Sequence, residues 1–419
     1  MNPLNIALLH YSCPPVVGGV EEVVRQQALL FKRYYQNVKV FAGDGGQFSN
    51  EFEVEINPLL GSRNKSILRA HQALREGNEE YVEQLALKIY KYLKEALQGF
   101  DVLIAHNVLT MRYNLPLTFA LFRLAQENLL PIISWNHDSP YFYDDHPDYL
   151  DTSPWIILKK FHRKIFYVVI SESRKQQFAR LYGSHEHIYV VPNGVDPIAF
   201  FRLDPLTVRL IQEEKLFEAD LILVQPSRLH PRKNIELSIR VTHALHQQGV
   251  NVRFLLTGAY DPHEPKTVEY YRKLVGLARE LGIAKQVIIV AEYKFKSGQK
   301  ITADRIRIRD LYLIADALFM PSLQEGFGIP LLEAGMIKLP IICSRIPPFE
   351  EIGGQDVVFF DLNESPEHIA RRILEFKQRL EPQRMFRRVI KEYTWDNIYH
   401  YRLYPLLLQI LEEFQSWQR

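Results

Sequence analysis

The sequence has few cysteines, no long apolar run and almost no net charge. Its two cysteines, Cys13 and Cys343, lie far apart without metal-like spacing, which disfavours a disulfide scaffold and favours a reducing compartment, the cytoplasm. No run of roughly 18 apolar residues is present, which excludes an ordinary membrane-spanning helix. The N-terminus has no basic segment followed by an apolar one, so we expect no signal peptide. A formal net charge of +2 gives no reason to expect nucleic acid as a partner.

Common catalytic and cofactor motifs are absent as well. The sequence contains no GxSxG segment, no P-loop and no GxGxxG dinucleotide fingerprint. No cluster of His, Cys, Asp or Glu has the spacing of a metal site. We therefore expect neither a bound metal ion nor a dinucleotide cofactor.

The sequence does contain a regular alternation of apolar, strand-like runs and helices. In the first half we expect strands at 5–11, 38–42, 101–106, 131–135, 167–170 and 187–191. In the second half we expect them at 221–224, 252–256, 286–290, 317–320, 340–343 and 357–360. Helices are expected between most of them, including 20–35 and a long stretch near 64–98, and 293–305 is expected to be a loop. This alternation is typical of right-handed βαβ units, which build a parallel sheet with helices on both faces.

A short segment of turn-forming residues, Pro192–Asp196, separates the two halves. We therefore predict an α/β protein with two Rossmann-like domains, residues 1–195 and 196–395. Helices at about 396–419 are expected to complete the first domain. Ligands of such sheets bind at the carboxyl ends of the strands, so the loops of two facing domains would converge on one cleft.

The segment after the strand at 317–320 combines two carboxylates, two glycines and a proline: Glu325, Gly326, Gly328, Pro330 and Glu333. Pro330 suits the first position of a helix, and Glu333 is expected in the first turn. The glycines allow a ligand to approach the backbone, and the start of the helix attracts an anion such as phosphate. Carboxylates beside an anion site suit neutral hydroxyls, so the segment predicts binding of a sugar attached to a phosphate.

Two cations follow an earlier strand. Arg228 and Lys233 flank a short loop, and Asn234 is a candidate cap for the next helix. Two such charges would neutralise a diphosphate, above all while it departs. The alternative is ordinary surface charge, because Arg and Lys are mostly solvated. Taken together with Glu325 and Glu333, the phosphate-binding interpretation is favoured.

The first half contains two weaker candidates. Gly18 and Gly19 precede a helix whose amides would approach a phosphate, or they form a tight turn that needs positive φ. His137 follows a strand and is a candidate to bind a substrate hydroxyl or a leaving group, with Asp138 orienting it or raising its pKa. The alternative is a structural histidine, and His106 is a weaker candidate of the same kind.

Two basic segments raise the question of membrane contact. The segment Leu158–Tyr167 alternates basic and aromatic residues and would suit peripheral contact with anionic lipid. A solvated helix face is favoured, because the run is short and the chain is nearly neutral. The string Arg384–Arg388 is interpreted in the same way.

In combination, these motifs resemble the retaining glycosyltransferases of family 4, also called group 1. The segment from Glu325 to Glu333 resembles the E-x7-E signature of that family. Further matching segments occur in the family's order and extend the resemblance over nearly the whole chain: Gly18–Glu21, Pro192–Asp196, Ser227–Lys233, Pro340–Ser344 and Glu351–Gly353.

This resemblance implies the GT-B fold, with two Rossmann-like domains facing across a cleft and a final helix crossing back to the first domain. By motif position, Arg228 and Lys233 would hold the donor diphosphate, and Glu333 would bind the ribose. Glu325 would contact hydroxyls of the transferred sugar, with the backbone of Phe327, Gly328 and Ile329 nearby.

The resemblance also assigns the remaining candidates. Gly18 and Gly19 would approach the diphosphate or the acceptor, and His137 would touch the sugar or the acceptor. Members of the family resemble one another in needing no metal ion, so no cofactor is implied. The sequence departs from the family pattern at Asn234, where glycine is common, and at Thr257–Pro262, which replaces a Gly-x-Gly turn.

The activity implied is transfer of a hexosyl group from a UDP-, GDP- or ADP-sugar to a hydroxyl of a sugar, a polyol or a lipid-linked acceptor. Two alternatives stay open. One is a non-catalytic or regulatory protein that binds sugar nucleotides, and the other is a nucleotide-sugar epimerase of the same fold. The presence of both cations and both glutamates argues against the first alternative.

Overall fold

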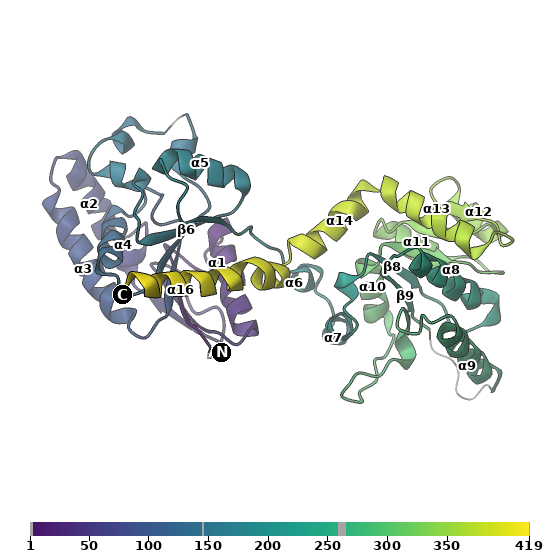
Figure 1. Cartoon of the computed structure of the whole chain (residues 1–419). Coiled ribbons are helices and arrows are strands. Elements are labelled where there is room, and N and C mark those ends of the chain that lie inside the picture. The colour runs from purple at the N-terminus through teal and green to yellow at the C-terminus, as the bar shows by residue number, and fades with distance from the viewer. Residues whose placement is uncertain (1–2, 145, 259–264, 419) are drawn as a thin grey trace. The chain divides into compact units, whose positions relative to one another are not determined.

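The computed structural model describes residues 3–144, 146–258 and 265–418, and it divides the chain into two compact units (Figure 1). Unit 1 comprises Met1–Val195 and Tyr393–Arg419, and unit 2 comprises Asp196–Glu392. The two chain segments of unit 1 are hydrogen-bonded to each other where the first one ends and the second one begins. The amide of Val195 donates to the carbonyl of Tyr393 (2.8 Å), and that of Trp395 donates to the carbonyl of Val195 (3.1 Å). Gly194 packs against the Trp395 ring, which a Cβ at that position would approach to 2.8 Å.

Unit 1 is built on a seven-stranded parallel sheet with the order β3-β2-β1-β4-β5-β6-β7. Its strands are β1 (Asn5–His10), β2 (Asn37–Ala42), β3 (Glu53–Ile56), β4 (Val102–His106), β5 (Ile132–Asn136), β6 (Ile165–Val169) and β7 (Ile188–Val190). Its α-helices are α1 (Gly19–Arg33), α2 (Lys65–Arg75), α3 (Glu80–Ala96), α4 (Leu115–Glu127), α5 (Glu172–Tyr182), α15 (Trp395–Ile398) and α16 (Tyr404–Trp417).

Both faces of this sheet are covered by helices. Successive side chains of a strand point to opposite faces, so Ala7 and Leu9 of β1 pack with α2, α3, α4 and α5, whereas Ile6 and Leu8 pack with α1 and α16. Because helices cover both faces, the side chains on both sides of each strand are apolar, and the strands form continuous apolar runs in the sequence.

The C-terminal helices complete unit 1. A single π-helical turn (Tyr399–Leu403) joins α15 to α16, which lies against the same unit as the N-terminal strands (Figure 1). Leu406, Leu407 and Ile410 of α16 belong to the core beneath α1, and the ring of Trp417 stacks on Phe166 with centroids 4.8 Å apart.

Unit 2 is built on a six-stranded parallel sheet with the order β10-β9-β8-β11-β12-β13. Its strands are β8 (Leu221–Gln225), β9 (Val252–Leu256), β10 (Val287–Ile289), β11 (Ala317–Met320), β12 (Ile341–Ser344) and β13 (Val358–Phe360). Its α-helices are α6 (Pro197–Phe201), α7 (Pro205–Glu213), α8 (Ile235–Gln247), α9 (Pro265–Glu280), α10 (Arg305–Ile314), α11 (Ile329–Met336), α12 (Pro347–Gly353), α13 (Pro366–Arg379) and α14 (Glu381–Glu392). Helices α7, α10, α11 and α12 cover one face, and α8, α9 and α13 cover the other.

The predicted α/β class, with a parallel sheet in each half, is confirmed, but some elements differ from expectation. Strand β3 was not predicted, because Glu53 and Glu55 make it look polar; both carboxylates bind Lys39 of the neighbouring strand β2, at 2.9 and 2.8 Å. The long helix expected near 64–98 is two helices, because the chain turns between α2 and α3 at Gly77, whose φ is +78°. Glycine adopts this left-handed conformation readily.

The prediction of a solvated helix face is wrong for the first basic segment, whereas the second is helical with Arg384 and Arg388 exposed and only Arg387 buried. The first contains the end of a short 3-10 helix (Trp155–Lys159) and then strand β6. In the second, Arg387 on α14 is buried and forms an ion pair with Asp316 of the segment before β11. No helix in the described part of the chain is both long and apolar enough to span a membrane.

Candidate functional site

Each sheet has one point at which the strand order reverses. In unit 1 this point lies between β1 and β4, and in unit 2 between β8 and β11. The connections on either side of such a point leave in opposite directions, so the loops at the carboxyl ends of the two strands flank a crevice. These two edges are the places where each unit is built to bind a ligand, and both hold the candidates from the sequence.

In unit 2 the reversal point carries an ion pair between two of the predicted residues. Lys233 ends a 3-10 helix (Pro231–Lys233) after β8, and its Nζ lies 2.5 Å from Oε1 of Glu325 in the loop after β11. The two side chains are 13% and 9% exposed. Ser322 Oγ donates to the same carboxylate oxygen at 2.8 Å. A shielded cation and carboxylate therefore face each other across the edge.

The two loops that bear this pair are tied to each other and to the sheet. The amide of Leu323 donates to the carbonyl of Arg232 at 2.8 Å, which joins the loops directly. The buried side chain of Gln225, the last residue of β8, donates to the carbonyl of Lys233 at 3.0 Å and accepts from Ser238 Oγ at 2.6 Å. The backbone at Lys233 is thus fixed before any ligand binds.

Arg228, the second predicted cation, lies on the same loop as Lys233. Its side chain is exposed and has no hydrogen bond or ion pair within the described residues, so it is available to an anion. The backbone beside it is closely packed, because a Cβ at Gly258 would lie 1.8 Å from the carbonyl oxygen of Ser227. Of the predicted departure at Thr257–Pro262, positions 259–262 lie outside the described residues.

The loop after β11 leads into α11, and two details of the prediction are wrong there. The helix begins at Ile329, so Pro330 is its second residue and Glu333 lies in its second turn. Gly328 precedes the helix with φ +128°, and a Cβ there would lie 3.2 Å from Phe349 and Ile352, so glycine is required. The preference for glycine thus comes from the backbone conformation and from packing.

The start of α11 is open to an anion. No side chain caps this helix end, and Phe327 and Ile329 are each more than half exposed, at 55% and 59%. The unpaired amides of a helix start, together with the helix dipole, favour a negative group.

Glu333 faces a cavity of its own. Oε2 of Glu333 accepts a hydrogen bond of 2.9 Å from the Tyr312 hydroxyl on α10. Burial, followed by this hydrogen bond and the carboxylate charge, raises the pKa of Tyr312, which therefore stays a donor. Both residues line a cavity of about 310 Å³ between α10 and α11. The second carboxylate is thus held in place and accessible, and its tyrosine partner was not predicted from the sequence.

In unit 1 the reversal point carries histidines instead of an ion pair. Nδ1 of His10, at the end of β1, lies 2.6 Å from the carbonyl oxygen of His106, at the end of β4. Nδ1 of His106 lies 3.4 Å from Nε2 of His137, which follows β5, and Nδ1 of His137 lies 3.4 Å from Nδ2 of Asn193. His10 was not predicted: the sequence shows that it ends the first strand, but only the strand order shows that this strand is central.

These histidines are held neutral. Burial, and then the charge of His10, lower the pKa of His137 to about 3. Burial holds the pKa of His106 well below its ordinary value and also lowers that of His10. Neutral imidazoles accept as well as donate, so this edge favours an uncharged polar ligand.

The predicted role of Asp138 as the partner of His137 is wrong. The Asp138 carboxylate accepts from the Tyr143 hydroxyl at 2.8 Å and forms an ion pair of 3.0 Å with Arg174. The His137 backbone amide is held by Oδ1 of Asn107 at 3.0 Å. The pKa of His137 is consequently lowered, where an adjacent carboxylate would have raised it.

Gly18 and Gly19 do not form a turn with positive φ, so that alternative is wrong. Gly18 is extended (φ −171°), and Gly19 begins α1. Glu21 already lies over this helix start: a Cβ at Gly18 would meet its Oε2 at 2.0 Å. Glu21 Oε1 accepts from Ser12 Oγ at 2.5 Å and lies 3.8 Å from His10 Nε2. A carboxylate at this position disfavours a second anion.

A larger cavity of about 820 Å³ opens beside these groups in unit 1. Its polar lining includes His10, Glu21, Asp44, Arg63 and Asn107. His137 does not belong to this lining. Glu21 was visible in the sequence only as part of the glycine segment, since its partners are distant in the chain. In neither unit do the described residues include three or more His, Cys, Asp or Glu side chains placed to hold a metal ion.

Two protein-family models match this chain, and the boundary between the two matches falls close to the boundary between the two units. The model of glycosyl transferases group 1 matches residues 209–393, which are nearly all of unit 2. The model of glycosyltransferase family 4 matches residues 17–198, which are most of the first segment of unit 1.

Individual relatives are distant. Mannosylglucosylglycerate synthase of Petrotoga mobilis is 24% identical over 377 residues, which cover 83% of this chain and 84% of the relative. A stretch of 69 residues is 41% identical to the serotype-specific mannosyltransferase WbdA of Escherichia coli and covers 16% of this chain and only 8% of that protein. Among solved structures, sucrose-phosphate synthase from Thermosynechococcus elongatus aligns over 97% of this chain and 99% of its own, with 17% identity and a TM-score of 0.39.

Proposed function

Because this chain belongs to the group 1 glycosyltransferases of family 4, we propose that it transfers a hexosyl group from a nucleotide diphosphate sugar to an acceptor hydroxyl. We further propose that the reaction retains the configuration of the anomeric carbon and needs no metal ion.

The observation that carries this proposal is the shielded pair of Lys233 and Glu325 at the reversal point of unit 2. In the donor complex, Lys233 and the exposed Arg228 bind the diphosphate, together with the uncapped start of α11. Glu325 then exchanges its lysine partner for hydroxyls of the hexose. Glu333, held by Tyr312, binds the ribose hydroxyls at the other end of the donor.

The chemistry assigned to these groups is electrostatic. The acceptor oxygen forms a bond to the anomeric carbon on the face from which the diphosphate leaves, and the bond from that carbon to the phosphate oxygen breaks. The departing phosphate takes the acceptor proton. Lys233 and Arg228 stabilise the negative charge that develops on this phosphate, which lowers the barrier more than it stabilises the bound donor.

We assign the acceptor to the edge of unit 1 that carries the histidines. The cavity there is lined by His10, Glu21 and Asn107, groups that exchange hydrogen bonds with hydroxyls. Glu21 at the start of α1 is the reason to assign Gly18 and Gly19 to the acceptor side, since its carboxylate would repel a diphosphate. His137 is not part of this cavity lining, and its role is to hold the ring of His106 in place.

Acceptor-dependent release of nucleoside diphosphate tests the proposal. Purified protein is first screened by thermal shift against UDP-, GDP- and ADP-sugars, because a donor at about 100 times its Kd stabilises the folded state by about 2.7 kcal/mol. The donor found is then incubated with sugar and polyol acceptors, and nucleoside diphosphate is quantified. We expect release only when an acceptor is present, and a product with the anomeric configuration of the donor.

Glu325→Ala is the decisive variant. Transfer should fall at least about a hundredfold, while circular dichroism stays unchanged, since Glu325 lies at the sheet edge. Glu350→Ala is a matched control, because this glutamate lies on neighbouring α12 and contacts Arg345 at the surface. Near-normal turnover of Glu325→Ala would refute the assignment.

The same assay separates the alternatives. A non-catalytic sugar-nucleotide-binding or regulatory protein would be stabilised by the donor but would release no nucleoside diphosphate. A nucleotide-sugar epimerase would convert the donor without any acceptor. The close pairing of Lys233 with Glu325 favours the transferase, because it keeps both charged groups ready beside the helix start.

A further inference from the structure

One face of helix α10 lines the cavity beside Glu333. The residues that reach it, Arg305, Ile308, Arg309 and Tyr312, are spaced i, i+3, i+4 and i+7, so they form a single stripe. Arg305 and Arg309 therefore both line the cavity that also holds Glu333. The cavity volume, about 310 Å³, lies within the range of small-molecule sites.

The rest of the lining is apolar. Ile308 on α10, Met336 and Ile337 at the end of α11, and Pro226 after β8 provide hydrocarbon surface. Such a combination suits a flat ring system whose edges carry polar atoms. It does not suit a sugar alone, which carries hydroxyls on most of its carbons.

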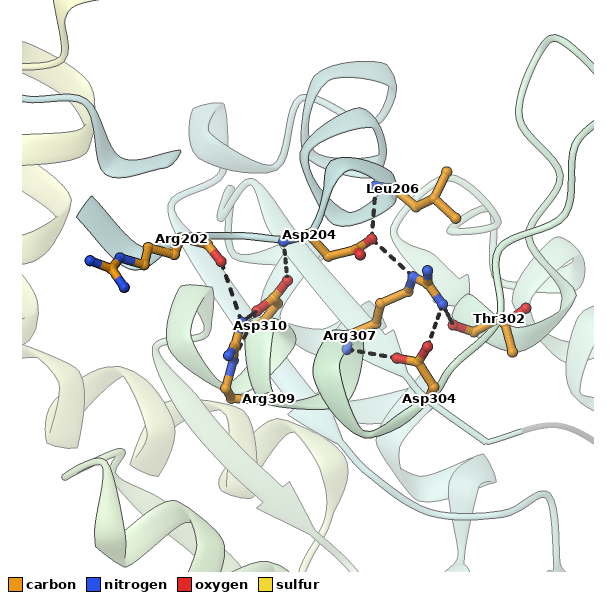
Figure 2. Close-up of polar contacts among 8 residues, drawn as sticks. All are labelled: Arg202, Asp204, Leu206, Thr302, Asp304, Arg307, Arg309 and Asp310. Atoms are coloured by element: carbon orange, nitrogen blue, oxygen red, sulfur yellow. Dashed lines mark hydrogen bonds and ion pairs between the residues drawn. The ribbon is translucent and has the colours of Figure 1, made fainter. Parts of the chain in front are cut away.

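A polar network on the other side of α10 fixes its orientation (Figure 2). Asp304 caps α10 by accepting from the Arg307 amide at 3.0 Å, and Asp204 caps α7 by accepting from the Leu206 amide at 2.9 Å. The Arg307 guanidinium bridges the two caps, with Nε 3.0 Å from Asp204 and Nη1 2.6 Å from Asp304. Both helix starts are thereby locked together.

The network also orients Arg309. The buried Asp310 accepts from the Asp204 amide at 2.7 Å, and its Oδ1 accepts from Nε (3.1 Å) and Nη2 (2.5 Å) of Arg309. Figure 2 shows the Arg309 guanidinium extended alongside Asp310 towards the carbonyl of Arg202, to which Nη2 donates at 3.4 Å. Within the described residues its Nη1 has no partner, and the exposed Arg305 has none at all. Donors thus remain for a ligand in the cavity.

We propose that this cavity binds the nucleoside of the donor and that Arg305 and Arg309 recognise its base, with a preference for guanine. The inference rests on the proposed function, in which Glu333 binds the ribose. The guanidinium of Arg305, unpaired within the described residues, matches two adjacent acceptors, and guanine presents N7 and O6 side by side. Arg309, whose Nε and Nη2 bind Asp310, adds Nη1 as one further donor. Adenine presents a donor beside N7, and uracil offers O4 beside an N–H donor, so neither gives two adjacent acceptors.

Isothermal titration of the whole protein with GDP, UDP, ADP and inorganic pyrophosphate tests the proposal. Wild type should bind GDP at least about tenfold more tightly than UDP or ADP. Arg305→Gln should reduce that preference about tenfold and leave the affinity for pyrophosphate unchanged. Arg309→Lys should reduce the preference in the same direction, because lysine keeps a cation beside Asp310 but loses the Nη1 donor.

Arg240→Gln is the matched control. Arg240 is exposed on α8, which packs on the opposite face of the sheet, and its substitution should change none of the four affinities. Tighter binding of UDP or ADP by wild type, or an unchanged preference in both variants, would overturn the base assignment while the proposed function stands. Failure of wild type to bind any nucleoside diphosphate would overturn both.

Discussion

Each unit has a parallel sheet with one reversal point, but the side chains at the two points differ in charge. At its reversal point, unit 2 holds a cation and a carboxylate in contact, Lys233 and Glu325. At the equivalent point, unit 1 holds His10, His106 and His137, whose burial lowers their pKa values. The edge of unit 2 holds a cation paired with a carboxylate, whereas the edge of unit 1 holds neutral histidines beside the carboxylate of Glu21.

This difference teaches what each edge can bind. A diphosphate needs cations and open amides, which Lys233, Arg228 and the start of α11 provide. A hydroxyl that must give up a proton needs neutral partners that do not compete for it. Where unit 1 has its own helix start, Glu21 covers it. This difference supports our proposal that the anionic ligand binds unit 2.

The largest predicted effect concerns the stability of the charged unit. Arg387→Ala should lower the free energy of unfolding by about 4 kcal/mol, because it leaves the carboxylate of Asp316 buried without its cation. The two side chains are 8% and 2% exposed, and Arg387 Nε lies 2.7 Å from Asp316 Oδ1. Calorimetry measures the change.

Arg388→Ala provides the control for that measurement. Arg388 is the exposed neighbour on α14, and its pairing with Glu392 at 3.3 Å is at the surface. Its loss should cost no more than about 0.5 kcal/mol. Equal destabilisation by both variants would contradict the view that unit 2 depends on a buried ion pair.

The next effect separates the two edges by function. Lys233→Ala should lower kcat/KM about a hundredfold, roughly 3 kcal/mol, because the diphosphate loses a cation in the transition state. His10→Gln in unit 1 should raise KM for the acceptor and leave the Kd of the donor unchanged. Steady-state kinetics with each substrate varied in turn provide the comparison, and a donor defect in His10→Gln would contradict it.

A third effect depends on pH and concerns the histidines at the edge of unit 1. The pKa of His137 is about 3 in the folded protein and near its ordinary 6.5 in the unfolded chain. Between these values the unfolded chain binds one more proton, so the free energy of unfolding falls as the pH falls below 6.5. Near pH 5 the expected loss is about 2 kcal/mol for this histidine.

Tryptophan fluorescence during chemical denaturation measures this loss in unit 1. The chain's tryptophans, Trp135, Trp155, Trp395 and Trp417, all lie in that unit. His137→Gln should flatten the pH dependence of the free energy of unfolding. His246→Gln, which replaces an exposed histidine of unit 2, should leave that pH dependence unchanged. An unchanged slope in His137→Gln would show that His137 is not held neutral.

The smallest effect compares the glycines before the two helices. Gly328→Ala should cost about 1–2 kcal/mol, because its φ of +128° disfavours any side chain. Gly19→Ala should be neutral or slightly stabilising, since a Cβ at Gly19 meets nothing within 4 Å and the residue is helical. Thermal unfolding of both variants tests this, and equal costs would contradict the distinction.

The sequence was sufficient for the parallel α/β architecture, because fully buried strands give continuous apolar runs. It was insufficient where a residue's environment depends on distant partners. Arg387 looked solvated until Asp316 was seen beside it, and β3 looked polar although Lys39 neutralises its glutamates.

The candidate site shows the same limit. The spacing from Glu325 to Glu333 located both carboxylates, but the contact of Glu325 with Lys233 joins residues 92 positions apart. His10 was overlooked because only the strand order places it at the reversal point. No sequence motif contains Tyr312 or the two arginines of α10. They lie together only because they share one face of that helix.

The most direct test of the central claim is a crystal structure of the protein with a non-transferable nucleotide diphosphate sugar. The account predicts the diphosphate on Lys233 and Arg228 at the start of α11, the hexose on Glu325 and the ribose on Glu333, all within unit 2. A diphosphate bound at the glycine segment of unit 1, with Lys233 still paired to Glu325, would contradict it.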